Sequence, residues 1–201
     1  MHKKTAANSP AVRLGVFSDT HGNARYMQEA LQNLGPFNMI IHLGDGVREG
    51  RELAKQWGLP FMGVRGNEDY GALAPMDDDI SFHGFKVFMM HGHQMEINPY
   101  QDAETWDRHY KEMAQRAARN SADIFLFGHT HKPVLKNREG VLICNPGDHY
   151  LGSSFPPGFI ELIIEPRKAA AVLFLRKSAG QWIENAREEL HSQTAAKAVG
   201  A

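Results

Sequence analysis

The fold is decided by residues 12–46, VRLGVFSDTHGNARYMQEALQNLGPFNMIIHLGDG. An apolar run over 11–17 leads into the polar residues 18–22, which is typical of a buried strand followed by a loop. Apolar residues within 24–34 then recur every three or four positions and predict a helix. A second apolar run follows over 37–43. Because a helix-length crossover joins the two strands, the sequence predicts parallel pairing in an α/β sheet.

The rest of the chain changes character part-way along. A second helix and a third strand over 59–64 repeat the first pattern, whereas the later part is dominated by short strands without room for helices. This change predicts two packed sheets with helices outside, in one domain over residues 11–180. We expect residues 1–10 to be a disordered lead-in, and residues 181–201 to be a C-terminal extension that is partly helical and then frays. The elements predicted after the third strand are strands and one helix (101–120), the strands lying over 80–82, 85–90, 123–127, 134–136, 141–144, 159–165 and 171–176.

The composition excludes several classes of protein. Hydrophobic residues make up 42% of the chain and charged residues 22%, as in ordinary globular domains. The net charge of −1 removes the case for a broad nucleic-acid surface or for attraction to an anionic membrane. Cys144 is the only cysteine, so no intrachain disulfide can form, which suits a reducing cytoplasm. We therefore expect a cytoplasmic protein without a membrane partner. A homodimer stays open, because dimers are the commonest assembly.

Residue types that bind metals follow five of the predicted strands, each beside a glycine. Ligands of α/β sheets bind outside the carboxyl ends of the strands, so these side chains are expected to meet in one crevice. Carboxylate, amide and imidazole groups without a thiolate disfavour structural zinc and calcium, and they suit Mn, Fe, Co, Ni or Zn. Seven ligands are too many for one catalytic ion, so two ions roughly 3.5–4 Å apart are predicted, sharing one carboxylate. The seven candidates are Asp19, His21, Asp45, Asn67, His91, His129 and His131.

These motifs resemble those of the calcineurin-like metallophosphoesterases, and most of all the small prokaryotic phosphodiesterase branch, which also includes the scaffold subunit of eukaryotic retromer. The resemblance covers roughly residues 12–165. The motifs that carry it are Asp19-x-His21, Gly44-Asp45, Gly66-Asn67-x-Asp69, His91-Gly-His93 and Gly128-His129-x-His131, followed by Asn145-Pro146-Gly147.

The resemblance implies a four-layer αββα sandwich of two mixed sheets flanked by helices, and hydrolysis of a phosphoester by a hydroxide that bridges two metal ions. We expect Mn to be the activating ion in an assay, with Ni, Fe, Co or Zn as alternatives. The family pattern places Asp19, His21 and His131 on the first ion, and Asn67, His91 and His129 on the second, with Asp45 bridging.

Glu68 is a departure from the family pattern, because many members have a histidine at this position that acts on the phosphoryl or leaving group. Glu68 could act as an acid only if burial raised its pKa well above the reference of about 4.3. Otherwise its negative charge repels a monoester dianion more than a diester monoanion, which favours a small or cyclic phosphodiester as substrate. The predicted catalytic residues are Asn67, Glu68, His91 and His93, with His93 either contacting the phosphate or orienting a ligand. Asp148 is a second departure, standing where the family often has serine, and it adds negative charge to this region.

Two alternatives remain open at this point. One is a phosphomonoesterase that uses the same site, and the other is a metal-stabilised protein-interaction scaffold with little turnover. Among the remaining residues, His42 is expected to pack beside the site rather than bind metal, and Asp69 either hydrogen-bonds a ligand or stabilises its turn. Cys144 is expected in the core. His149 is interpreted as an ordinary surface or turn residue, as are His83, His109 and His191.

Overall fold

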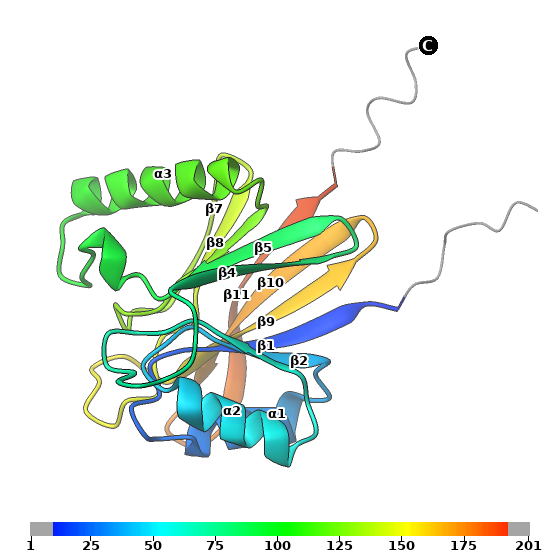
Figure 1. Ribbon diagram of the computed structural model, residues 1–201, viewed down its shortest axis with the longest axis vertical. Helices are drawn as coiled ribbons and strands as arrows, with labels where there is room; N and C mark the ends of the chain where they lie inside the picture. The colour runs from blue at the N-terminus through cyan, green and yellow to red at the C-terminus, as the bar shows by residue number, and fades with distance from the viewer. Residues whose placement is uncertain (1–9, 193–201) are drawn as a thin grey trace, which may run out of the picture.

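Two β-sheets form the centre of the computed structural model, which describes residues 10–192 (Figure 1). The first sheet has the strand order β11-β10-β9-β1-β2-β3, and the second has the order β4-β5-β6-β8-β7. The strands of the first sheet are β1 (Val12–Phe17), β2 (Met39–His42), β3 (Phe61–Gly63), β9 (Gly158–Glu165), β10 (Lys168–Arg176) and β11 (Trp182–His191). Those of the second are β4 (Asp77–Phe82), β5 (Phe85–Met90), β6 (Ile124–Leu126), β7 (Val134–Arg138) and β8 (Val141–Asn145).

Helices cover the outer face of each sheet, as Figure 1 shows. Helices α1 (Arg25–Leu34) and α2 (Val47–Gln56) pack on the first sheet through an apolar cluster that includes Met27, Leu31 and Leu53. Helix α3 (Ala103–Arg119) packs on the second sheet through Trp106 and Met113. A third cluster fills the space between the sheets. The predicted four-layer αββα sandwich of two mixed sheets is therefore confirmed.

The long helix illustrates how local signals produce these elements. The side chain of Asp102 accepts a hydrogen bond from the Thr105 amide at 2.7 Å and caps the first turn of α3, a contact worth about 1 kcal/mol. Arg116 and Arg119 lie in the last turn, where their positive charge favours the carbonyl end of the helix dipole. Within residues 10–192, no helix combines the length and apolar character that a transmembrane span requires.

The C-terminal prediction is wrong for residues 182–191, which form strand β11 rather than a helix. The segment is rich in Glu, Arg and Ala, which favour helices in isolation. Pairing with β10 along its length, with a bulge opposite Leu173 and Phe174, outweighs that preference. Strand β11 thus belongs to the same sheet as β1, and the domain extends past residue 180. The expectations for residues 1–9 and 193–201 lie outside the described residues.

The direction of the strands decides where the candidate ligands lie. Strands β1, β2 and β3 are parallel to one another, and so are β5, β6 and β8. The loops that leave their carboxyl ends are joined across the two sheets, since the backbone amide of His129 donates to the Asp19 carboxylate. All seven candidate ligands are therefore on loops at one end of the sandwich.

Candidate metal centre

Backbone hydrogen bonds hold the loops of the candidate site against one another. The amide of Asp19 donates to the Gly44 carbonyl at 2.9 Å, and the amide of His21 donates to the Asp45 carbonyl at 3.1 Å. These two bonds join the loops after β1 and β2. In the second sheet, the amide of Gly128 donates to the His91 carbonyl at 2.8 Å. The candidate ligands are thus held by main-chain contacts as well as by their side chains.

The backbone of this region is strained at the candidate ligands themselves. Left-handed backbone conformations cost about 1–2 kcal/mol per non-glycine residue, and Asp, Asn and His are the side chains that tolerate them best. Such strain gathers at functional sites. Nothing in the spacing of the sequence indicated it. Five of the seven candidates have φ between 44° and 66°, namely Asp19, His21, Asp45, His129 and His131.

Two glycines allow the loops to approach this closely. A Cβ on Gly66 would overlap the carboxylate of Asp45, and a Cβ on Gly128 would overlap the hydroxyl of Ser18. The absence of a side chain at both positions is therefore a steric requirement of the site. It explains why glycine stands beside the ligand types in two of the motifs.

The first group of candidate ligands consists of Asp19, His21 and His131. Asp19 Oδ1 lies 3.5 Å from His131 Nε2 and 4.0 Å from His21 Nε2. The two imidazole nitrogens are 3.2 Å apart. On the far side of its ring, His131 Nδ1 lies 2.6 Å from the buried carboxylate of Asp148. Since a carboxylate accepts the Nδ1 proton, the Nε2 lone pair is left facing the group.

The second group consists of Asp19, Asp45 and His91, and all three are buried. His91 Nδ1 donates to the Leu43 carbonyl at 2.7 Å, which directs Nε2 toward the two carboxylates. His91 Nε2 lies 3.3 Å from Asp45 Oδ2 and 3.9 Å from Asp19 Oδ1. The two groups share Asp19, so they form one continuous centre.

The electrostatics of this centre test whether its residues fit a metal ion. Burial raises the pKa of Asp19, against the lowering influence of His91 and His131. Burial lowers the pKa of His91, but the neighbouring Asp45 and Asp19 outweigh it and the pKa is raised. Among the described residues, Asp19 Oδ1 and His91 Nε2 are buried without a hydrogen-bond partner. Buried polar atoms normally have partners, and one divalent cation would supply a partner to both. The residues therefore fit a metal ion.

Glu68 lies at the solvent side of the centre, in a third group with His21 and Asp45. Its carboxylate is 3.1 Å from His21 Nδ1, and its amide donates to Asp45 Oδ1 at 2.7 Å. The side chain is 57% exposed. The burial that an acid role would require is therefore missing, and the condition set for Glu68 as a general acid is not met.

The other three candidates surround the buried groups less closely. The His129 ring is centred 5.2 Å from the His91 ring, and burial lowers the pKa of His129 to about 4. The His93 ring is centred 5.4 Å from that of His91. Burial is the main cause that lowers the pKa of His93, and the charge of His91 is the second cause. Asn67 is exposed, and it lines a cavity of about 360 Å³ together with His93.

Several surrounding residues support the loops. Asp69 accepts hydrogen bonds from the amides of Asp45, Gly46, Val47 and Gly66, so the turn-stabilising interpretation is confirmed. His42 is packed beside the site as expected, and its ring forms hydrogen bonds with the Thr20 hydroxyl and the Gly44 amide. Cys144 is fully buried.

His149 is not a surface residue, which corrects the prediction. It is fully buried, and its ring contacts Phe17 and Trp182 of β11. The wrong helix prediction for the C-terminal segment and the wrong surface prediction for His149 are related, because Trp182 of β11 packs against the His149 ring. The sequence indicates only that Asp148 adds negative charge here, and the pairing of Asp148 with His131 has no signal in the local sequence.

Comparison with known proteins identifies the family of this chain. The model of the calcineurin-like phosphoesterase superfamily domain matches residues 12–159. The chain belongs to the calcineurin-like phosphoesterase superfamily. A probable metallophosphoesterase of Methanothermobacter thermautotrophicus is 27% identical over 163 residues, covering 79% of this chain and 89% of that protein. A phosphodiesterase of Methanocaldococcus jannaschii is 25% identical over 154 residues, covering 68% of this chain and 84% of that protein.

A solved structure shows the same fold at lower identity. The wild-type Vps29 of Entamoeba histolytica, crystallised with Zn²⁺, superimposes with a TM-score of 0.67 at 21% identity. The superposition covers 90% of this chain and 99% of that one. Members of the superfamily depend on metal, and the ligand groups of this chain agree with that dependence.

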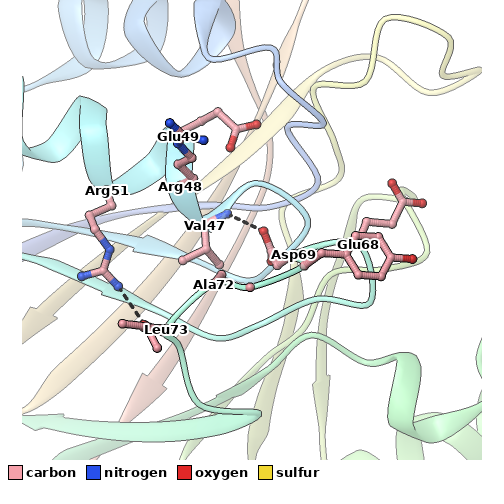
Figure 2. A pocket seen from close by; sticks show the side chains of 10 residues that line it. Val47, Arg48, Glu49, Arg51, Glu68, Asp69, Ala72 and Leu73 are labelled. Atoms are coloured by element: carbon pink, nitrogen blue, oxygen red, sulfur yellow. Dashed lines mark hydrogen bonds between the residues drawn. The ribbon is translucent and has the colours of Figure 1, made fainter.

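A cavity lined in part by Glu68 adjoins the centre. It has a volume of about 610 Å³, and Figure 2 shows Arg48, Glu49 and Arg51 of α2 around it, with Glu68 and Asp69 on the facing loop. Arg51 donates to the Leu73 carbonyl, a bond drawn as a dashed line in Figure 2. Charged side chains line part of this cavity and uncharged ones, among them Tyr70 and Leu73, line the rest, and the cavity adjoins the centre on the side of Glu68.

Proposed function

We propose that this chain is a metal-dependent phosphodiesterase that hydrolyses a small or cyclic phosphodiester. The observation that carries the proposal is the meeting of Asp19 Oδ1 and His91 Nε2, both buried and lacking hydrogen-bond partners among the described residues, at the carboxyl ends of two parallel sets of strands. Such a pair needs a cation, and members of the superfamily use divalent ions to hydrolyse phosphoesters.

We infer two ion positions. Asp19, His21 and His131 would hold one ion, and Asn67, His91 and His129 the other, with Asp45 between them. When bound, two divalent ions lower the pKa of a water molecule and offset the charge of phosphoryl oxygens. We expect Mn²⁺ to be the activating ion, with Ni²⁺, Fe²⁺, Co²⁺ or Zn²⁺ as alternatives. A cytoplasmic location and a homodimer stay predictions.

The residues of the chain have separable roles in this proposal. The Leu43 carbonyl and the Asp148 carboxylate keep the protons of His91 and His131 on Nδ1, so that both Nε2 atoms are free to bind a cation. The lowered pKa of His93 keeps this ring neutral near pH 7. Its Nδ1 is buried without a partner among residues 10–192, which suits a contact to the phosphate.

The preference for a diester rests on charge at the entrance. Glu68 is exposed there and stays close to His21 Nδ1. A carboxylate in this place repels a dianionic monoester more strongly than a monoanionic diester. The M. jannaschii relative is named a phosphodiesterase, which supports the same preference.

A protein-interaction scaffold is the second candidate. Tyr70 is 90% exposed and Leu73 is 95% exposed, and both lie on the loop after β3. Exposed apolar side chains that gather near one site are typical of interaction surfaces. The fold is also that of Vps29. This candidate predicts metal binding without useful turnover.

The test is hydrolysis of bis(4-nitrophenyl) phosphate and of 4-nitrophenyl phosphate by metal-stripped protein, with and without added Mn²⁺. Asp45→Ala removes the shared ligand, and Asp79→Ala is the matched control, because Asp79 pairs with Lys86 away from the site. Diester turnover that requires Mn²⁺ and is lost only in Asp45→Ala supports the proposal. Faster monoester turnover would establish a phosphomonoesterase. Metal binding without turnover under Mn²⁺, Ni²⁺, Co²⁺ or Zn²⁺ would favour the scaffold.

A further inference from the structure

A second cavity adjoins the metal centre on the side of His129 and His131. Its volume is about 440 Å³, within the range of small-molecule sites. Two tyrosines from different loops line it, Tyr100 before α3 and Tyr150 after β8. Candidate metal ligands and two aromatic rings thus line the same cavity. A substituent bound in this cavity would belong to the same molecule whose phosphate is bound at the metal centre.

The lining of this cavity carries no Lys, Arg, Asp or Glu. Apart from the two histidines, its polar groups are hydroxyls, including those of Thr130, Ser153 and Ser154. The cavity at Glu68 differs, since Arg48, Arg51 and Glu49 line it. An ionic group is therefore better accommodated beside Glu68, and an uncharged group that can accept or donate hydrogen bonds is better accommodated beside Tyr100 and Tyr150.

The two rings are held in different ways. The Tyr150 ring meets the His21 ring edge-on, with centroids 5.3 Å apart, and it lies over Gly152, where an added Cβ would come within 2.7 Å of the ring. The position of Tyr150 thus depends on the metal ligand on one side and on a missing side chain on the other. The loop that carries Tyr100 is tied by its own hydrogen bonds, among them that from the Tyr100 amide to Asn98 Oδ1 at 3.0 Å.

Both rings keep surface available to a ligand. Tyr100 is 85% exposed and Tyr150 is 48% exposed. Large aromatic side chains of this kind stack on planar groups, and stacking of a base on a protein ring contributes a five- to more than hundredfold increase in affinity, as an order of magnitude. Two such rings beside a metal centre are unexplained by the fold itself, because neither belongs to a core cluster.

We propose that Tyr100 and Tyr150 form a binding subsite for an uncharged, planar aromatic group of the substrate, an aryl or nucleobase group attached to the phosphate. The inference rests on the proposed function for the position of the phosphate. It predicts that one ester group of the preferred diester is aromatic and lies on the His129 and His131 side of the centre.

Equilibrium binding tests the subsite without requiring turnover. The monomethyl esters of phenylphosphonate and cyclohexylphosphonate are both monoanions and have the same number of carbon atoms, but only the phenyl ring is planar. We expect Mn²⁺-loaded protein to bind the phenyl compound about tenfold more tightly in isothermal titration. Tyr100→Ala should abolish this preference, and Tyr100→Phe should keep it. Tyr70→Ala is the matched control, because Tyr70 is an equally exposed tyrosine that lines the other cavity.

A kinetic comparison then distinguishes aryl from nucleobase groups. The 4-nitrophenyl ester of thymidine 5′-phosphate and ethyl 4-nitrophenyl phosphate share a charge and a leaving group. A kcat/KM about tenfold higher for the thymidine ester, lost in Tyr100→Ala, identifies a nucleobase as an occupant. A phenyl preference in binding without this kinetic preference leaves an aryl group as the occupant.

Equal binding of the two phosphonates, no detectable binding of either, or a phenyl preference that survives in Tyr100→Ala would overturn the subsite. Diester turnover with no ring preference would also overturn it while leaving the proposed function in place. A phenyl preference lost in Tyr100→Ala, in a protein that hydrolyses no diester, would support the subsite and reject the proposed function.

Discussion

Asp148→Asn is the substitution that best tests how the centre is built. Asp148 is fully buried, and its carboxylate lies 2.6 Å from His131 Nδ1. The carboxylate holds a proton on that nitrogen. An asparagine can donate its own amide proton to Nδ1 instead, which moves the imidazole proton to Nε2, the atom that faces Asp19 and His21. A protonated Nε2 has no lone pair for a cation.

The expected effect is a loss of metal affinity without a loss of folding. Changing a residue that orients a metal-binding histidine typically reduces metal affinity 10–100-fold, or about 1.4–2.8 kcal/mol. The metal-free protein should lose at most about 1–3 kcal/mol of unfolding free energy and stay folded, because the amide keeps a hydrogen bond to His131 and only the charge of the pair is removed. The Mn²⁺ dissociation constant is measured by competition with a chromophoric chelator, and stability by urea unfolding with EDTA.

Glu161→Gln is the matched control for this experiment. Glu161 is also a buried carboxylate, but its partner is Arg13, at 2.5 Å and away from the centre. Its replacement should lower the free energy of unfolding by about 1–3 kcal/mol and leave Mn²⁺ affinity unchanged. If Asp148→Asn binds Mn²⁺ within twofold of the wild type, the carboxylate does not orient His131 and the reasoning fails.

Three further predictions concern stability and the loops. Mn²⁺ at about 100 times its dissociation constant should stabilise the fold by about 2.7 kcal/mol, which raises Tm by about 5–10 °C over the EDTA-treated protein in calorimetry; an unchanged Tm would mean that no ion binds the native centre. Gly66→Ala should abolish Mn²⁺ binding in the same chelator assay, because the new methyl group overlaps the Asp45 carboxylate, whereas Gly71→Ala should only reduce stability, because its methyl group meets no atom within 4 Å and its cost comes from the φ of +74° alone. His149 has a pKa lowered to about 4 by burial, so the unfolded chain binds its proton at higher pH than the folded chain does. His149 alone should therefore contribute a loss of about 3 kcal/mol to metal-free protein as pH falls from about 6.5 to 4, and His149→Gln should remove this contribution in urea titrations at each pH.

The parts of the fold that local sequence could predict are those whose signals lie within one segment. The βαβ pattern of residues 12–43 places apolar and polar residues in order, and every element in it is confirmed. The gathering of Asp19 and Asp45 followed from the same pattern, because parallel strands bring their carboxyl ends to one edge. Strand β11 shows the limit, since its composition favours a helix and only pairing with β10 makes it a strand.

The sequence by itself predicted two packed sheets and the candidate ligands, because these depend on apolar patterns and on residue types at strand ends. The resemblance of its motifs to a known family implied the superfamily and the four-layer sandwich. Only the tertiary structure decided how the ligands are aimed. Asp148 pairs with His131, and the Leu43 carbonyl accepts a hydrogen bond from His91. Tyr100 and Tyr150 line the same cavity. Each of these arrangements joins segments that are distant along the chain. Such contacts arise when separate strands and loops pack together, so no periodicity or spacing in a single segment encodes them.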